Sequence, residues 1–271
     1  MSQPAIRLVV SDVDGTLITP AKVLTPRAQD AVRRLLAAGI HFTIVSARPP
    51  RGMRMLVDAL GLHDPFAAFN GALLSGPDLA VLRETCLPPD AARSTIGLMI
   101  AAALDVWLYT DCLWYVRDPR LPHVERERRA VQFDPEVVAG FDRLLDRVVK
   151  LAGVSDDFDA VARCEQEVLA RCGEQVAASR SQPYFLDVTH VSVNKGLAVC
   201  AIADMLNVPL AHVATIGDGP NDVAMFKQSG FSIAMGNATP EIQSAAQVVT
   251  VSNQNDGFAE AMERYVLPII T

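Results

Sequence analysis

Several features that would mark a specialised class of protein are missing from this sequence. No uninterrupted apolar run reaches the roughly 18 residues that a membrane-spanning helix needs. No internal repeat or low-complexity tract is visible, and 24 basic side chains face 31 acidic ones, which gives a formal net charge of −7. Because this balance repels polyanions, we expect no nucleic-acid partner, and because no apolar run is long enough, we expect no membrane partner. A small phosphorylated molecule drawn into a locally positive pocket stays compatible with it.

Cysteine is scarce, and its spacing suits neither metal nor disulfide. The five cysteines are Cys86, Cys112, Cys164, Cys172 and Cys200. They form no C-x-x-C motif, and an odd number leaves one thiol over in any disulfide scheme. We interpret them as small buried hydrophobic residues in a reducing compartment. The N-terminal segment also lacks a signal-peptide pattern, because Ser11 and Asp12 interrupt its short apolar run. We expect a cytoplasmic protein.

The sequence is rich in apolar residues and alternates short strands with amphipathic helices. Its 271 residues, half of them hydrophobic, have the length of one large domain or two ordinary ones. The N-terminal part predicts strand, helix, strand, helix, strand at residues 6–10, 25–39, 40–45, 52–60 and 66–69. The C-terminal part predicts strands at residues 212–216, 231–234 and 248–251, with helices after 195, 220 and 240. This alternation predicts an α/β fold with a doubly wound parallel sheet and right-handed crossovers.

The composition and the sequence pattern change between these two parts. A proline pair, a long apolar helix pattern, aromatic strands and a charged segment follow one another there. We interpret residues 83–183 as a second α/β domain, inserted into a core that is formed by residues 1–82 and 184–271.

The sharpest local signal is Asp12-Val13-Asp14-Gly15-Thr16, directly after the first predicted strand. In a doubly wound sheet the carboxyl ends of the strands border the ligand crevice, so we expect both carboxylates there. The first acid can attack a phosphate, and the second can protonate the leaving alcohol and then deprotonate water. Gly15 permits close backbone approach, and Thr16 offers a hydroxyl and an N–H to phosphate oxygens. An ordinary acidic turn that ends in glycine is the alternative.

A second acidic segment, with the sequence GDGPND at residues 217–222, lies between a predicted strand and a predicted helix. Mg²⁺ prefers carboxylate oxygens, so Asp218 can complete a metal site with Asp12 and the backbone carbonyl of Asp14. Asp222 falls in the first helical turn, where an acid stabilises the helix dipole by about 0.3–1 kcal/mol. Taken alone, this segment leaves a helix cap and a metal site equally open, and the first motif favours the metal site.

Further polar residues lie at strand ends and helix starts. The hydroxyl of Ser46 and the N–H of Ala47 suit a phosphate oxygen, although a serine N-cap explains them equally well. Lys195 begins a predicted helix, where its charge opposes the dipole. Neutralising a carboxylate nucleophile and an incoming phosphate would explain this placement, and a solvated lysine is the alternative. Asn70 and Gly71 are candidate substrate contacts or simply a turn.

Taken in order, these segments resemble the four motifs of the haloacid dehalogenase superfamily of phosphatases. The matching segments are residues 12–16, Ser46, Lys195 and residues 217–222. The long insertion between the second and third motifs resembles the C2-type cap. The segments that are similar to the Cof-type (IIB) sugar-phosphatase branch are Asn70-Gly71, residues 194–196, residues 235–238 (MGNA) and Asp256-Gly257. The resemblance covers the core, and the cap matches in length and texture.

The resemblance implies a Rossmann-like core with an inserted cap, and a mechanism through an aspartyl phosphate. It implies that Asp12 is the nucleophile, Asp14 the general acid and base, and Lys195 the neutralising lysine. It implies that Ser46 binds and Asn221 orients the phosphate, and the residues themselves add Gly15, Thr16, Ala47, Asn70 and Gly71 as candidate phosphate or substrate contacts. The implied metal is Mg²⁺, held by Asp12, Asp14 and Asp218, with Asp222 orienting the lysine and the metal-bound water. Where the family commonly has Thr-Gly-Arg, this chain has Ser46-Ala47-Arg48, which leaves the role of Arg48 open.

We therefore expect a Mg²⁺-dependent phosphomonoester hydrolase that acts on a small phosphorylated metabolite, in the first place a sugar phosphate. Two alternatives stay open: a sugar-phosphate mutase or phosphotransferase on the same core, and a non-catalytic sugar-phosphate sensor. The sequence says little about specificity or oligomeric state. Candidate specificity residues in the insertion are Arg117, Asp118, Arg120 and His123, for which surface or turn roles are the alternative.

Overall fold

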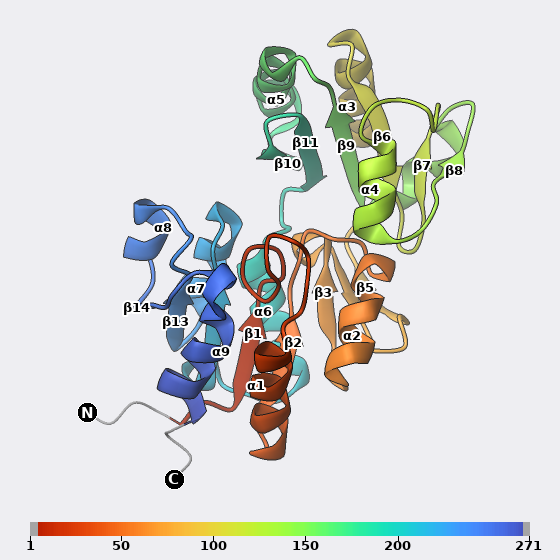
Figure 1. Cartoon of the computed structure of the whole chain (residues 1–271). Helices are drawn as coiled ribbons and strands as arrows, with labels where there is room; N and C mark the ends of the chain where they lie inside the picture. The colour runs from red at the N-terminus through yellow and green to blue at the C-terminus, as the bar shows by residue number, and fades with distance from the viewer. Residues whose placement is uncertain (1–4, 268–271) are drawn as a thin grey trace. The chain divides into compact units, whose positions relative to one another are not determined.

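The computed structural model describes residues 5–267 (Figure 1). The chain divides into two compact units. Within the described residues, the first unit contains residues 5–47, 54–80 and 194–267, and the second contains residues 48–53 and 81–193.

The first unit is built around a parallel sheet with the strand order β14-β13-β12-β1-β2 in its described part (Figure 1). The strands are β1 (Leu8–Ser11), β2 (His41–Ile44), β12 (Val213–Gly217), β13 (Phe231–Ala234) and β14 (Val248–Val249). The helices are α1 (Pro26–Ala37), α2 (Arg54–Leu60), α6 (Lys195–Met205), α7 (Val223–Gln228), α8 (Pro240–Ser244) and α9 (Gly257–Ala261).

Helices cover both faces of this sheet because its side chains are apolar on both sides. Leu8 and Val10 of β1 share a buried cluster with apolar residues of α6. On the opposite face Phe42 of β2 meets Phe258 of α9 edge to face, with 5.7 Å between ring centroids. Apolar runs of this kind form strands that are buried on both faces. The predicted doubly wound parallel sheet is confirmed.

Helix α1 shows how local sequence sets an element's limits. The hydroxyl of Thr25 accepts a hydrogen bond from the Ala28 N–H at 3.1 Å, and Pro26 occupies the first turn. Gly39, with φ of +75°, ends the segment in the left-handed conformation that glycine adopts without strain. The helix therefore begins where the Thr-Pro pair predicts.

The strand order reverses between β1 and β12. The chain runs from β1 to β2 on one side of β1, whereas β12, β13 and β14 extend the sheet on the other side. Ligand crevices in open α/β sheets lie at the carboxyl ends of the strands where the order reverses. Asp12 follows β1 and Asp218 follows β12, and the Asp12 N–H donates to the Ile216 carbonyl at 2.9 Å. The sheet thus places both acids at this point.

The third predicted strand does not join the sheet as expected. Strand β3 (Phe66–Ala68) pairs antiparallel with β4 (Leu73–Ser75), and a parallel bridge between Val45 and Ala67 links it to the end of β2. The reason lies in the turn: Phe69, Asn70 and Gly71 all have positive φ values, of 49°, 58° and 104°. These left-handed residues turn the chain back into a hairpin.

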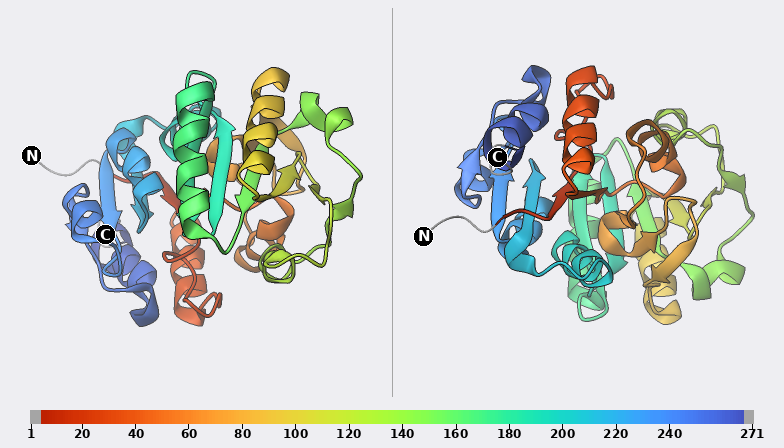
Figure 2. Two further views of the ribbon diagram at one scale, coloured as in Figure 1. Left: turned by 90° about the horizontal axis from the view of Figure 1, so that it is seen from above. Right: turned by 90° about the horizontal axis from the view of Figure 1, so that it is seen from below.

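The second unit contains a six-stranded sheet with the order β10-β11-β9-β6-β7-β8. The strands of this sheet are β6 (Asp105–Tyr109), β7 (Trp114–Val116), β8 (Glu136–Val137), β9 (Lys150–Val154), β10 (Val176–Gln182) and β11 (Phe185–His190). The unit also holds β5 (Val81–Glu84), α3 (Pro89–Ala101), α4 (Val124–Val131) and α5 (Phe158–Cys172). Helices α3 and α5 pack on one face of the sheet (Figure 2).

The second unit extends further along the chain than residues 83–183. Strand β11 pairs with β9 and β10, so residues up to Val193 belong to this unit. Residues from 184 onward were expected in the core, because the insertion was expected to end near the proline at residue 183. An apolar run does not specify which of two sheets its strand joins.

The cysteines and the apolar helices can be compared with what the sequence predicted. All five cysteines are free thiols; Cys164 and Cys172 are buried, whereas Cys112 is exposed. The expectation of buried cysteines is therefore wrong for Cys112, which lies in a surface turn after β6.

Among residues 5–267, no helix combines the length and the apolar character that crossing a membrane requires.

Candidate active site

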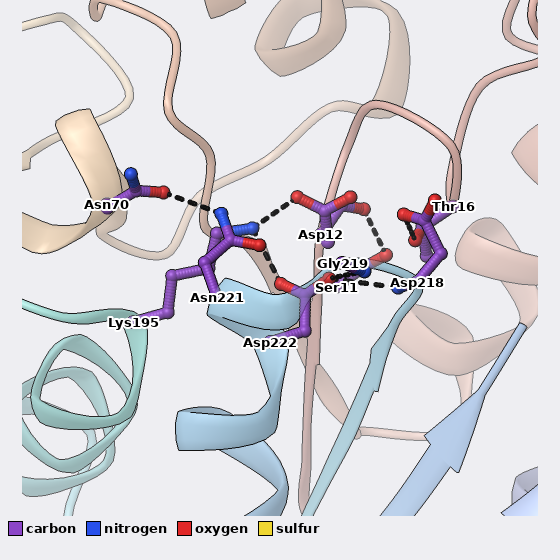
Figure 3. A network of polar contacts seen from close by, with 9 residues as sticks. All are labelled: Ser11, Asp12, Thr16, Asn70, Lys195, Asp218, Gly219, Asn221 and Asp222. Atoms are coloured by element: carbon purple, nitrogen blue, oxygen red, sulfur yellow. Dashed lines mark hydrogen bonds and ion pairs between the residues drawn. The ribbon is translucent and has the colours of Figure 1, made fainter. Parts of the chain in front are cut away.

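A buried lysine and two carboxylates form the centre of the site (Figure 3). Nζ of Lys195 donates to Oδ1 of Asp12 at 2.5 Å and to Oδ1 of Asp222 at 2.7 Å. The lysine is 1% exposed. A solvated surface lysine is therefore excluded, and the ammonium neutralises charge inside the protein.

The start of helix α6 explains the position of Lys195. The side chain of Asn194 accepts a hydrogen bond from the Leu197 N–H at 2.9 Å and so caps the helix. Gly196 lets α6 approach α7, since a Cβ at this position would overlap the Ala224 carbonyl oxygen. The helix begins directly at the lysine, and the close approach brings Lys195 to Asp222.

Asp222 acts both as a local cap and as a partner of the lysine. Its Oδ2 accepts hydrogen bonds from the N–H groups of Asp218 and Gly219 at 2.9 and 2.8 Å, while Oδ1 faces Lys195. Both oxygens are thus engaged, which fixes the carboxylate. A Cβ at residue 217 would overlap the Asp222 carboxyl carbon, so Gly217 is required there.

Asp218 is held by groups from two distant segments. Its Oδ1 accepts from the Thr16 hydroxyl at 3.0 Å, and its Oδ2 accepts from Nδ2 of Asn237 at 3.1 Å. Gly15 has a φ of +89°, and a Cβ there would overlap Oδ2 of Asp218. The glycine of the first motif is needed because the backbone passes close to this carboxylate.

The carboxylates fit a divalent cation. Asp12, Asp218 and Asp222 each offer an oxygen, and these three oxygens lie within 4.8 Å of one another. Three carboxylates against the single ammonium of Lys195 leave a formal charge of −2 in this cluster. Hard cations such as Mg²⁺ take oxygen ligands of this type. The carboxylate of Asp222 belongs to this cluster, and the side chain of Asp14 does not. The predicted ligand from Asp14 was its backbone carbonyl, and this ligand stays a prediction.

The pKa values in the cluster reflect its excess of negative charge. Burial raises the pKa of Asp12 to about 8 against the opposing charge of Lys195, and Asp222 and Asp218 raise it further. Burial and the charge of Asp222 raise the pKa of Asp218 to about 6. Burial alone would lower the pKa of Lys195, but Asp12 and Asp222 outweigh it and raise that pKa. A bound cation would relieve the repulsion among the carboxylates.

Asp14 lies in a more open position than Asp12. Its Oδ1 pairs with Nζ of Lys22 at 2.5 Å, and the two side chains are 34% and 56% exposed. Lys22 has a φ of +62° in a turn where its N–H donates to the Thr19 carbonyl. The exposure of Asp14 gives it access to a substrate and to water, which a proton-transfer residue needs.

The remaining predicted phosphate contacts lie close to the same edge of the sheet. Ser46 is buried after β2, and its N–H donates to the Ala67 carbonyl; no helix begins at this residue, so a serine N-cap is excluded. Ala47 follows Ser46 in the chain. Nδ2 of Asn221 donates to Oδ1 of Asn70 at 3.1 Å (Figure 3).

Gly71 has a packing role that its sequence context did not indicate. A Cβ at this position would lie 2.9 Å from Cβ of Ala198 in α6. Arg48, whose role the sequence left open, donates to the Gly52 carbonyl at 3.3 Å. The contact of either residue with a substrate stays a prediction.

In the second unit, three of the candidate specificity residues, Asp118, Arg120 and His123, form local pairs, and Arg117 is exposed. Arg120 binds Asp118 through two hydrogen bonds of 2.9 and 2.8 Å, which holds the pKa of this carboxyl at about 2. Nε2 of His123 lies 2.8 Å from Oδ1 of Asp156, and its ring stacks on Tyr184. Their role in specificity stays a prediction.

The structure adds a residue that the sequence interpretation did not place in the site. Asn237, in the MGNA segment after β13, donates to the Gly15 carbonyl at 2.9 Å as well as to Asp218. Its position in the sequence could have indicated this, because the segment follows the carboxyl end of a predicted strand, and these strand ends meet at the same edge of the sheet.

Comparison with known proteins supports the same assignment. Residues 9–262 match the family described as haloacid dehalogenase-like hydrolase. A Haemophilus influenzae protein that carries a provisional phosphatase name is 31% identical over 258 residues, which cover 95% of this chain and 97% of that one. A haloacid dehalogenase-like hydrolase from Bacteroides thetaiotaomicron is 27% identical, with a TM-score of 0.87 over 96% of this chain and 99% of that one.

The fold of the Cof-type branch is also found among solved structures. A protein named as a sugar phosphatase of HAD subclass IIB is 21% identical, with a TM-score of 0.82 over 96% of this chain and 99% of that chain. The family match over residues 9–262 and the 31% identical relative confirm the family predicted from the motifs. The chain belongs to the haloacid dehalogenase-like hydrolases, and it is a phosphatase of that family.

Proposed function

We propose that this phosphatase is a Mg²⁺-dependent phosphomonoester hydrolase that acts through an aspartyl phosphate on Asp12. The observation that carries the proposal is the meeting of Asp12, Lys195, Asp218 and Asp222 where the strand order reverses between β1 and β12. Mg²⁺, held by the carboxylates of Asp12 and Asp218 with the backbone carbonyl of Asp14, would supply positive charge next to the phosphate oxygens.

In the first step Asp12 attacks the phosphorus atom. Lys195 binds Oδ1 of Asp12, so we assign the attack to Oδ2. A bond forms between Oδ2 and phosphorus while the bond from phosphorus to the ester oxygen breaks. Lys195 lowers the pKa of Asp12 against the burial that raises it, and a bound cation would favour the ionised nucleophile further.

Asp14 transfers the protons. It protonates the leaving ester oxygen, and it then accepts a proton from the water that attacks the aspartyl phosphate and releases inorganic phosphate and Asp12. The ion pair of Asp14 with Lys22 is partly exposed, at 34% and 56% of the two side chains, and exposed pairs are worth at most about 1 kcal/mol, so it does not prevent the Asp14 side chain from turning. Ser46, Asn70 and Asn221 are the proposed contacts for the phosphate and its neighbouring groups.

The proposed substrate is a small phosphorylated metabolite, in the first place a sugar phosphate. This class agrees with the name of the subclass IIB relative, which is called a sugar phosphatase. A sugar-phosphate mutase would use the same two aspartates and pass the phosphoryl group to a second hydroxyl. A sensor would need no proton-transfer residue, and Asp14 therefore favours an enzyme.

The test replaces the nucleophile and follows inorganic phosphate. With Mg²⁺ and a panel of sugar phosphates, nucleotides and cofactor phosphates, we expect the wild type to release phosphate in step with substrate loss. Asp12→Asn should reduce the rate at least about 10³-fold, whereas Asp58→Asn, an exposed acid on α2, should leave it unchanged. Near wild-type turnover by Asp12→Asn contradicts the nucleophile assignment. Isomerised product without phosphate supports the mutase, and tight binding without turnover supports the sensor.

A further inference from the structure

The amide of Asn237 joins two chain segments that meet at the proposed metal site. Its Nδ2 donates to the Gly15 carbonyl at 2.9 Å and to Oδ2 of Asp218 at 3.1 Å. Gly15 belongs to the loop after β1, and Asp218 follows β12. One NH₂ group therefore uses both of its hydrogens on oxygens from the two loops that carry the proposed metal ligands.

A second asparagine fixes which way the Asn237 amide points. The backbone N–H of Asn253 donates to Oδ1 of Asn237 at 2.9 Å, so the carbonyl side of the amide faces Asn253 and the NH₂ side faces Asp218. The side chain of Asn253 is 6% exposed and donates to the Ile18 carbonyl at 2.8 Å. An amide turned the other way would bring two oxygens together at Asp218 and leave the Asn253 N–H facing an NH₂ group.

The turn that carries Asn237 is itself rigidly held. The Met235 N–H donates to the Gly217 carbonyl, and the Gly236 N–H donates to the Val251 carbonyl. Nε2 of Gln243 donates to the carbonyls of Gly236 and Ala238 at 3.2 and 2.9 Å. A side chain on such a turn keeps its place, so its hydrogen bonds can hold another group in position.

We propose that Asn237 is a positioning residue that orients the Asp218 carboxylate and the Gly15 loop for a divalent cation. The proposal rests on the Mg²⁺ site of the proposed function. Partners that orient ligating carboxylates typically change metal affinity about 10–100-fold when they are removed. Asn237 acts on affinity and not on the reacting atoms, so turnover at saturating Mg²⁺ should change far less than the Mg²⁺ concentration needed for half-maximal activity.

The experiment measures Mg²⁺ binding without turnover. Isothermal titration of the full chain with MgCl₂, together with the Mg²⁺-dependent rise in thermal unfolding temperature, is compared for the wild type, Asn237→Ala and Asn237→Ser. The serine hydroxyl is too short to reach both acceptors. Asn253→Ala is the matched control, because it removes a buried hydrogen bond to Ile18 and keeps the Asn253 N–H that faces Asn237. Asp218→Asn serves as the reference for loss of a ligand.

We expect Mg²⁺ dissociation constants about 10–100-fold higher for both Asn237 variants, and a wild-type value for Asn253→Ala. Equal affinity of the wild type and the Asn237 variants would overturn the proposal. An equal loss in Asn253→Ala would also overturn it, because the effect would then come from general loosening of the loop. If the wild type binds no Mg²⁺ and Asp218→Asn behaves identically, the proposed metal site fails, and this inference fails with it.

Discussion

Replacing Lys195 by methionine should destabilise the protein strongly, because it removes the ammonium that neutralises Asp12 and Asp222. Methionine has nearly the length of the lysine stem, so the change deletes a charge without opening a large cavity. The lysine is 1% exposed and lies 2.5 and 2.7 Å from its two partners, so solvent does not screen the loss.

The magnitude follows from the burial of both carboxylates. Removing one partner of a buried ion pair costs about 3–5 kcal/mol, because the charge left behind has lost its compensation. Asp222 loses its partner here, and Asp12 adds less because its pKa of about 8 leaves it largely protonated at pH 7, so we expect the free energy of unfolding to fall by an amount within this range. For a chain of this size that corresponds to roughly 10 °C in unfolding temperature.

The destabilisation should grow with pH. Burial already raises the pKa of Asp12 to about 8, far above the ordinary value of 3.8. A carboxyl with a raised pKa holds a proton in the folded state that it releases on unfolding, so stability falls as pH rises from about 4 to the folded pKa. Without Lys195 this pKa rises further. We expect the variant to lose more stability at pH 8 than at pH 5.5.

The assay is urea unfolding of the metal-free protein in EDTA at pH 5.5, 7 and 8, for the wild type and Lys195→Met. Lys227→Met, an exposed lysine near the end of α7, is the matched control and should change stability by less than about 0.5 kcal/mol. A loss below about 1 kcal/mol at pH 7 for Lys195→Met, or a loss that does not vary with pH, would refute the reasoning.

Three other changes test separate parts of the structure. Gly15→Ala should cost at least about 1–3 kcal/mol in urea unfolding, because φ is +89° and the new Cβ meets Asp218; wild-type stability would contradict this. Thr25→Ala should cost about 1 kcal/mol through the lost helix cap, and Thr25→Ser should restore most of it. Lys150→Met should lower the free energy of unfolding of the second unit by about 3–5 kcal/mol in urea unfolding, because its ion-pair partner Asp187 is 6% exposed. The double variant with Asp187→Asn should recover part of this loss.

Much of the first unit could be predicted because its signals are local. Thr25, Pro26 and Gly39 set the limits of α1 through capping and backbone conformation, which depend on neighbouring residues alone. The apolar runs at β1, β12 and β13 marked strands that are buried on both faces. Asp12 and Asp218 were assigned to the site because each follows such a strand, and the ends of parallel strands meet at one edge.

The errors concern decisions that local sequence does not make. The apolar run at β3 predicted a strand of the main sheet, and the domain boundary was drawn at residue 184 although β11 belongs to the second unit, because distant segments choose the pairing partners. Asn237 was not predicted as a site residue because its position in the sequence does not show which groups its amide contacts. Its role became visible when the fold brought it to Asp218.

The sequence by itself determined where helices and strands form, which acids end strands, and the family to which the chain belongs. Tertiary structure decided which of these side chains meet. Lys195 contacts a carboxylate 183 positions away in the chain, an approach that depends on the order of β1 and β12 and on the packing of α6 against α7. Backbone preferences and caps act over a few residues, whereas charge pairing and metal sites require groups that only strand order and helix packing bring together.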